Sequence, residues 1–139
     1  MTISKKIPVH DLIPQKEPFV FVDQVFDFEG TKWKSSFMVP EDHVFVEEGE
    51  LLKAGYVEVL AQSLAAGITF FNEDETPKIG FIGEVKGFSV YGTARVNDLL
   101  DVSVEVKNEV FNVLVVGGVI SVNGKTLAEG TLKLVLQDQ

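Results

Sequence analysis

The chain lacks cysteine, has a single arginine at position 95 and holds only two histidines, His10 and His43. Without cysteine, disulfide bonds and thiolate chemistry are excluded. The single arginine and the net charge of −9 argue against nucleic-acid binding, which depends on neutralising phosphates, and against an anionic membrane surface. Neither histidine has metal-ligand spacing and no glycine-rich phosphate motif is present, so we expect no metal and no other cofactor.

The composition is that of an ordinary globular protein, with 45% hydrophobic and 24% charged residues. A length of 139 residues suits a single domain spanning residues 1–139, and no repeat or linker divides it. The N-terminus lacks the apolar run of a secretory signal, so a cytoplasmic protein is the simplest expectation.

The central segment, residues 51–72, has the pattern of a buried helix. Its apolar residues recur at spacings of three and four, the period of an α-helix. The opposite side carries alanines rather than charges, and Glu58 is the only charged residue between Lys53 and Glu73. A helix that is apolar nearly all round is enclosed by other elements.

Strand-like segments lie on both sides of this helix. Two precede it, at residues 19–28 and 31–39, and four follow it, at residues 79–91, 99–108, 110–122 and 126–136. Asn123-Gly124 is a strong signal for a hairpin turn, a weaker turn is expected at Glu109, and Gly117-Gly118 inside a strand indicates a bulge or bend. The order predicts an α+β protein in which a curved antiparallel sheet wraps one long central helix.

Three separated patches resemble the 3-hydroxyacyl-acyl carrier protein dehydratase family of hotdog-fold proteins. Residues 12–23, LIPQKEPFVFVD, are similar to the family's Leu-Leu-Pro-His-Arg-x-Pro-Phe-Leu-Leu-Val-Asp motif. Residues 58–62, EVLAQ, are similar to Glu-x-Met-Ala-Gln on its central helix, and residues 95–98, RVND, to the end of its Val-x-Pro-Gly-Asp strand. The closest similarity is to the short dehydratase-like proteins of aryl-polyene and flexirubin-type pigment clusters. The resemblance implies a hotdog fold, a place in fatty-acid-like biosynthesis, and a homodimer.

The chain also departs from this family at its catalytic histidine. The family's Gly-His-Phe-Pro motif is absent, because residues 43–52 read HVFVEEGELL. Gln15 replaces the histidine of the N-terminal motif, and His43 lies near the expected catalytic position but not on it.

Glu58 is the first candidate catalytic residue. A carboxyl group in a buried helix is costly unless it is partnered or protonated, and this environment suits a general acid or a base that activates water. The family resemblance implies the acid that protonates the departing hydroxyl group in β-elimination. The alternative is a structural carboxyl group, hydrogen-bonded to Gln62 one turn further on.

His43 is the candidate base that would remove the α-proton. Imidazole exchanges protons near neutral pH, and a His43–Glu58 pair across a dimer interface would restore the chemistry of a dehydratase. The alternative is a loop histidine with no catalytic role.

Four further residues are candidates for substrate binding. Gly55 could offer a backbone amide to a thioester oxyanion at the start of the helix. Gly80 and Gly83 would let a ligand approach the backbone of one strand, and Gln62 could orient Glu58. Each glycine could equally serve to accommodate the helix.

The sequence predicts a protein that binds an acyl thioester carried on acyl carrier protein or coenzyme A and resembles a 3-hydroxyacyl thioester dehydratase. A thioesterase is the first alternative, because it needs one helix carboxylate and no histidine. The second is a catalytically degenerate subunit that pairs with an active paralogue. Joining of sheet edges would give a homodimer, a hexamer or such a heteromer.

Overall fold

The computed structural model describes residues 2–3, 7–8, 12–13, 16–17, 19–72 and 78–138. His10 and Gln15 lie outside the described residues. The elements are, in chain order, β1 (Thr2–Ile3), β2 (Ile7–Pro8), β3 (Gln24–Glu29), β4 (Lys32–Met38), β5 (Val46–Glu47), β6 (Glu50–Leu51), α1 (Lys53–Asn72), β7 (Lys78–Val90), β8 (Leu99–Val110), β9 (Val113–Val122) and β10 (Lys125–Asp138).

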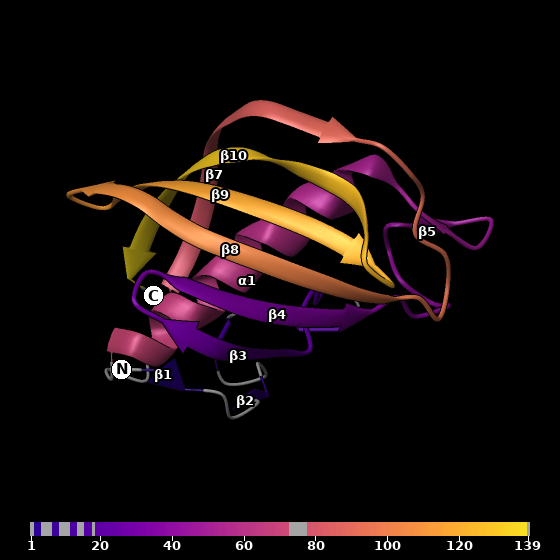
Figure 1. The fold of residues 1–139 in the computed structure, drawn as a ribbon, viewed down its shortest axis with the longest axis horizontal. Coiled ribbons are helices and arrows are strands. Elements are labelled where there is room, and N and C mark those ends of the chain that lie inside the picture. The colour runs from indigo at the N-terminus through magenta and orange to yellow at the C-terminus, as the bar shows by residue number, and fades with distance from the viewer. Residues whose placement is uncertain are drawn as a thin grey trace.

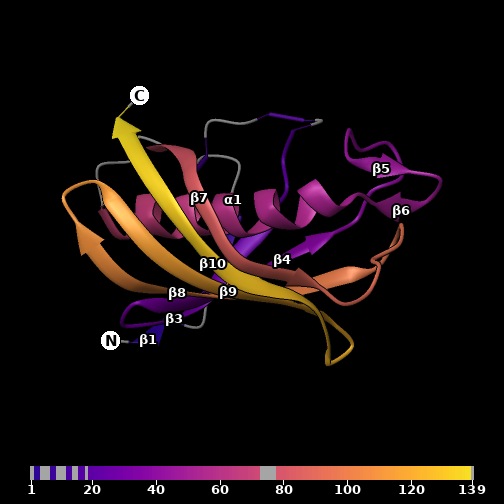
Figure 2. The same ribbon diagram turned by 90° about the horizontal axis from the view of Figure 1, so that it is seen from above.

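The long strands form one antiparallel sheet in the order β1-β3-β4-β8-β9-β10-β7, with β2 paired beside β3. The sheet curves around α1 (Figure 1), and the helix runs along its concave side (Figure 2). The short β5–β6 hairpin lies at the end of the molecule where the helix begins. The expected α+β hotdog arrangement, one long helix wrapped by a curved antiparallel sheet, is confirmed.

The helix is held against β4 by close contact and by buried hydrogen bonds. Trp33 on β4 packs so tightly on Gly67 that a methyl group there would overlap the indole ring. The Trp33 Nε1 donates to the Ser63 carbonyl at 2.9 Å, and the Ser35 and Ser63 hydroxyl groups lie 2.5 Å apart. Since a buried polar group is costly without a partner, these bonds fix both the rotation and the height of α1 over the sheet.

Two expectations for the strands need correction. The strand predicted from residue 19 begins only at Gln24, because backbone groups of residues 19–21 bond to side chains of the helix and of His43 rather than to a neighbouring strand. Of the bulge or bend predicted at Gly117-Gly118, the bulge is wrong, since both glycines pair in regular register with β8 and β10. A Cβ at Gly118 would strike Leu60, so this glycine allows the helix to approach the sheet closely.

The turn expected near Glu109 lies two residues later. Val110 pairs with Val113, so Phe111 and Asn112 form the turn between β8 and β9. Phe111 has a φ of 58°, in the left-handed region that bulky residues rarely adopt, and its side chain is 94% exposed. The other long hairpin turn has the expected Asn123-Gly124, whose φ values of 51° and 81° suit these residue types.

Replacing Phe111 with glycine is expected to raise the free energy of unfolding by about 1 kcal/mol, because glycine adopts this backbone conformation without strain. Thermal unfolding of the two proteins measures the change. Asn123→Gly is the matched control and should change stability little, since asparagine already tolerates positive φ. A lower stability in Phe111→Gly would show that the phenyl ring makes contacts worth more than the strain.

The β7 strand ends the sheet on one side. It is 13 residues long and, within the described part of the chain, pairs only with β10. Residues 83–87 near its middle are exposed, and Val85 is a large hydrophobic residue that remains 45% exposed. A long edge strand with exposed apolar side chains is a template for pairing with another chain.

Candidate active site

Glu58 lies on the second turn of α1 and is half-buried. Ala54, Val57 and Glu58 share one side of the first two turns and all keep some exposure, whereas most of the remaining helix is buried. The expected dry enclosure of Glu58 is therefore incomplete in a single chain. The carboxyl group is reachable from outside while its helix is packed in the core.

Gln62, one turn further along the helix, makes three hydrogen bonds and is 2% exposed. Its Oε1 accepts the Phe21 N–H at 2.7 Å, and its Nε2 donates to the Phe19 carbonyl at 3.0 Å and to Glu58 Oε2 at 3.3 Å. All of the amide's hydrogens are used, so the orientation of this side chain is fixed. The bond is accepted by Oε2 of Glu58, and no hydrogen bond joins Oε1 to another side chain or backbone group among the described residues.

His43 is 5% exposed and uses both ring nitrogens inside the chain. Nε2 lies 2.9 Å from the Val20 carbonyl oxygen, and the Phe45 N–H donates to Nδ1 at 3.1 Å. A carbonyl only accepts, so Nε2 carries the proton and Nδ1 provides its lone pair to Phe45. Within the described residues, no hydrogen bond or ion pair joins His43 to Glu58.

The three candidate glycines occupy different settings. The Gly55 N–H donates to the Leu52 carbonyl at 2.9 Å, so this amide is already engaged at the start of the helix. Gly80 pairs with Leu136 in the β7–β10 ladder, and Gly83 is the extra residue at a shift in that register. A Cβ at Gly83 would have only ordinary contacts of 3.7 Å, so packing alone does not require glycine there.

The residues that line two surface hollows do not include Glu58. One hollow, of about 550 Å³, lies across the outer face of the sheet among side chains of β4, β8, β9 and β10. The other, of about 320 Å³, lies beside the start of the helix and is lined by Glu47, Glu48, Glu50 and Lys53 among others. Neither of these two hollows is therefore a binding slot beside Glu58.

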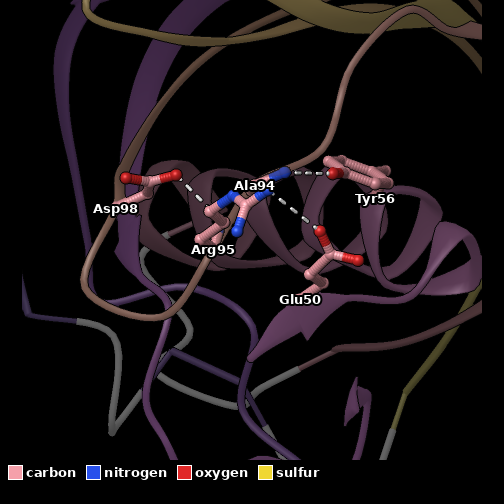
Figure 3. Close-up of polar contacts among 5 residues, drawn as sticks. All are labelled: Glu50, Tyr56, Ala94, Arg95 and Asp98. Atoms are coloured by element: carbon pink, nitrogen blue, oxygen red, sulfur yellow. Dashed lines mark hydrogen bonds and ion pairs between the residues drawn. The ribbon is translucent and has the colours of Figure 1, made fainter. Parts of the chain in front are cut away.

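The loop between β7 and β8 is tied to the start of the helix (Figure 3). The Ala94 N–H donates to the Tyr56 hydroxyl oxygen at 2.8 Å, and the Leu51 N–H donates to the Ala94 carbonyl at 2.9 Å. Arg95 Nη2 lies 3.4 Å from Glu50 Oε2, but both side chains are largely exposed, so this ion pair adds little stability. The Asp98 carboxylate accepts the Arg95 N–H at 2.8 Å and closes the turn. The bonds of Ala94 therefore anchor the start of the helix that carries Glu58, and the Arg-Val-Asn-Asp sequence forms the turn that follows.

Tyr56 should make the free energy of unfolding fall as the pH rises in the alkaline range. Burial raises the pKa of Tyr56 above its usual value of 10.0, the bond from the Ala94 N–H opposes this, and the carboxylates of Asp98 and Glu50 add to the rise. The unfolded chain then releases the tyrosine proton at a lower pH than the native chain, so stability falls as pH rises above 10.0.

Tyr56→Phe should remove this component of the pH dependence and, at neutral pH, lower the free energy of unfolding by about 1–3 kcal/mol, because the buried Ala94 N–H loses its acceptor. Urea unfolding of both proteins across the alkaline range measures both effects. Equal slopes against pH in the two proteins would contradict the assignment.

Sequence reasoning did not identify the backbone of residues 19–21 as part of this region. These residues lie in the N-terminal motif, but their partners, His43 and Gln62, are more than 20 positions away along the chain. Only the presence of the motif pointed to this segment, and no periodicity could reveal the contacts.

None of the described helices is long and apolar enough to cross a membrane. The described residues also form no group of three or more histidine, aspartate or glutamate side chains arranged to hold a metal ion.

The chain is similar in structure to several known proteins. It matches the dehydratase heterocomplex ApeI:P from Xenorhabdus doucetiae with a TM-score of 0.86 and 19% identity, over 97% of this chain and 94% of that chain. It matches Cj0977, a sigma28-regulated virulence protein from Campylobacter jejuni, with a TM-score of 0.66 and 17% identity, over 91% and 82% of the two chains. A hypothetical thioesterase from Streptococcus pneumoniae TIGR4, solved with coenzyme A, gives a TM-score of 0.62 and 11% identity over 83% and 85%. At these identities the matches establish the shared fold.

Sequence comparison adds the family. No curated protein sequence matches significantly. A sequence model of the ApeP-like family, described as ApeP dehydratase, matches residues 7–139, which is nearly the whole chain and includes Glu58, Gln62 and His43. The chain therefore belongs to the ApeP-like dehydratase family.

Proposed function

We propose that the chain provides the acid half of an active site that dehydrates a 3-hydroxyacyl thioester to the trans-2-enoyl thioester. The observation that carries this proposal is the half-buried Glu58 carboxyl group, which is oriented by Gln62 and accessible on the side of α1 where Ala54 and Val57 keep some exposure. Family membership supports the same reaction class. The acyl group would be carried on acyl carrier protein or coenzyme A, which fits a cytoplasmic role in building acyl chains.

The chemistry needs an acid and a base on the two sides of one carbon–carbon bond. A base removes the proton from the α-carbon, the electron pair forms the new double bond, and the C–O bond at the β-carbon breaks. Glu58, in its protonated form, gives its proton to the departing hydroxyl group, which leaves as water. Gln62 holds Oε2, so Oε1 is the oxygen that would face the substrate.

The base is proposed to come from a second chain. In this chain both nitrogens of His43 are occupied by Val20 and Phe45, so it would have to break a hydrogen bond before accepting a proton. Among the described strands β7 pairs on one side only, and its other edge, with the exposed Val85, offers a place for a second chain to join. The relative from Xenorhabdus doucetiae is a heterocomplex, which supports a heteromer with a paralogue over the homodimer that the family resemblance implies.

A thioesterase is the second candidate function. A single carboxylate on the central helix could activate water for attack on the thioester carbonyl, and this needs no histidine. The likeness of fold to a hypothetical thioesterase solved with coenzyme A supports this candidate. Family membership favours dehydration.

The test is to assay hydration of a crotonyl thioester and hydrolysis of a saturated acyl thioester, by the chain alone and after mixing with a paralogous dehydratase subunit. Hydration that needs both chains and depends on Glu58 would support the proposal. Hydrolysis by the chain alone that depends on Glu58 would replace it with the thioesterase.

A further inference from the structure

Residues 19–21 are held from two sides by side chains that are far apart in the sequence. From the helix, Gln62 bonds to the Phe19 carbonyl at 3.0 Å and to the Phe21 N–H at 2.7 Å. From the loop after β4, His43 Nε2 bonds to the Val20 carbonyl at 2.9 Å. Three consecutive residues of an otherwise irregular segment are thus fixed by two buried side chains.

The surroundings of His43 are those of a structural group. Its ring meets Phe21 edge-on, with centroids 4.3 Å apart, and Phe37 at 5.6 Å. Phe45 packs on Phe21 at 5.1 Å and also donates its N–H to His43 Nδ1. The imidazole therefore lies among aromatic rings, with each nitrogen directed at a backbone group of its own chain.

The bonds form a continuous path to the carboxyl group. His43 bonds to the Val20 carbonyl, and the neighbouring Phe19 carbonyl and Phe21 N–H bond to the side-chain amide of Gln62. Gln62 in turn donates to Glu58 Oε2. The Gln62 amide has its orientation set by the segment, because only one of its two flips places an acceptor at the Phe21 N–H and a donor at the Phe19 carbonyl. In the same flip the second hydrogen of Nε2 points to Glu58.

We propose that His43 is a positioning residue, which clamps residues 19–21 so that Gln62 presents the Glu58 carboxyl group in one orientation. This inference rests on the proposed function, since it assigns Glu58 as the acid. It gives His43 a role that requires a neutral, fully hydrogen-bonded imidazole rather than one that exchanges protons with substrate.

Two conservative substitutions separate the two bonds of His43. In His43→Gln the longer amide can still donate to the Val20 carbonyl, whereas in His43→Asn the shorter side chain can accept only from the Phe45 N–H. Neither side chain can act as a base. The variants are compared with the parent protein in its active assembly, at a temperature where all of them are folded.

Two measurements need no turnover. The rate of hydrogen exchange at the Phe21 amide measures how firmly residues 19–21 are fixed. The carbon-13 shift of the Glu58 carboxyl carbon measures the hydrogen bonding of that group. We expect His43→Gln to resemble the parent in both, and His43→Asn to show at least about tenfold faster exchange at Phe21 and a shifted Glu58 signal. Equal exchange and equal shifts in all three proteins would overturn the proposal.

Turnover gives the decisive contrast between positioning and base catalysis. Because small misplacements of a catalytic group are costly, His43→Asn should lose about 10-fold to 100-fold in kcat, whereas His43→Gln should stay within about threefold of the parent and keep the shape of its pH profile. Loss of about 100-fold or more in both variants, with the Glu58 signal unchanged in His43→Gln, would make His43 the base and overturn the proposal. Full turnover in Glu58→Gln would show separately that the proposed function is wrong. Hydrogen exchange at Phe21 and the carbon-13 shift of Glu58 would still test whether His43 fixes residues 19–21.

Discussion

Replacing Glu58 with glutamine is expected to lower kcat/KM for hydration of a crotonyl thioester by about 100-fold to 10,000-fold, the usual contribution of a positioned acid or base. Glutamine keeps the size of the side chain and still offers an oxygen to Gln62 Nε2, so the hydrogen bond at Oε2 can survive. It cannot deliver a proton to the departing hydroxyl group or withdraw one in the reverse direction. The loss should therefore fall mainly on kcat, with substrate binding little changed.

The measurement is steady-state hydration by the assembled enzyme, with the enoyl absorbance followed in both directions. Glu47→Gln is a suitable control, since this carboxylate is exposed on β5 and lies outside the proposed site. Unaltered turnover in Glu58→Gln would remove the acid from the mechanism. If the parent protein hydrolyses thioesters but shows no hydratase activity, and Glu58→Gln loses this hydrolysis, the protein is a thioesterase.

Replacing Gly67 with alanine is expected to lower the free energy of unfolding by about 2–4 kcal/mol, counting overpacking and the loss of a buried hydrogen bond. In an exposed helix this change usually stabilises, by about 0.5–1 kcal/mol. Here the new methyl group would overlap the indole of Trp33, which is 3% exposed. The ring cannot withdraw without breaking its bond to the Ser63 carbonyl.

Chemical unfolding of the parent and Gly67→Ala proteins measures this effect. Gly55→Ala on the same helix is the matched control, because the three atoms nearest to its methyl group would all belong to the side chain of Leu51, with Cδ1 at 2.7 Å. A side-chain tip can shift at low cost, so Gly55→Ala should change stability by less than about 1 kcal/mol. If both variants lose the same free energy of unfolding, the distance between helix and sheet, and not the Trp33 ring, limits the space at Gly67.

The regular elements were predictable because their signals are local. The helical period of residues 51–72 matches α1, and Asn123-Gly124 forms the turn between β9 and β10, since its backbone requirement is met by the residues themselves. Phe111 shows the opposite case. Nothing in its residue type favours a positive φ, and the strand pairing on both sides imposes the turn there.

The candidate site divides in the same way. Glu58 could be identified from the sequence, because one charge on an apolar helix stands out within a short window. The bond between Gln62 and Glu58 was also predicted, from their spacing of four residues on one helix. The bonds of Gln62 and His43 to residues 19–21 could not be predicted, since they exist only after this segment has folded over the helix. Gly117-Gly118 was misread as a bulge because two adjacent glycines have the same local pattern whether they bend a strand or admit a helix.

If the proposed partner pairs with the exposed edge of β7, folding of this chain would depend on the supply of that partner. A partner that pairs with this strand binds the native chain but not the unfolded one, so each tenfold excess of the partner over its Kd adds about 1.4 kcal/mol to the apparent stability. A chain made in excess would lack that contribution and would populate unfolded forms that proteases degrade. The cellular amounts of the two subunits would then be balanced by turnover of the unpaired copies, without any dedicated regulator.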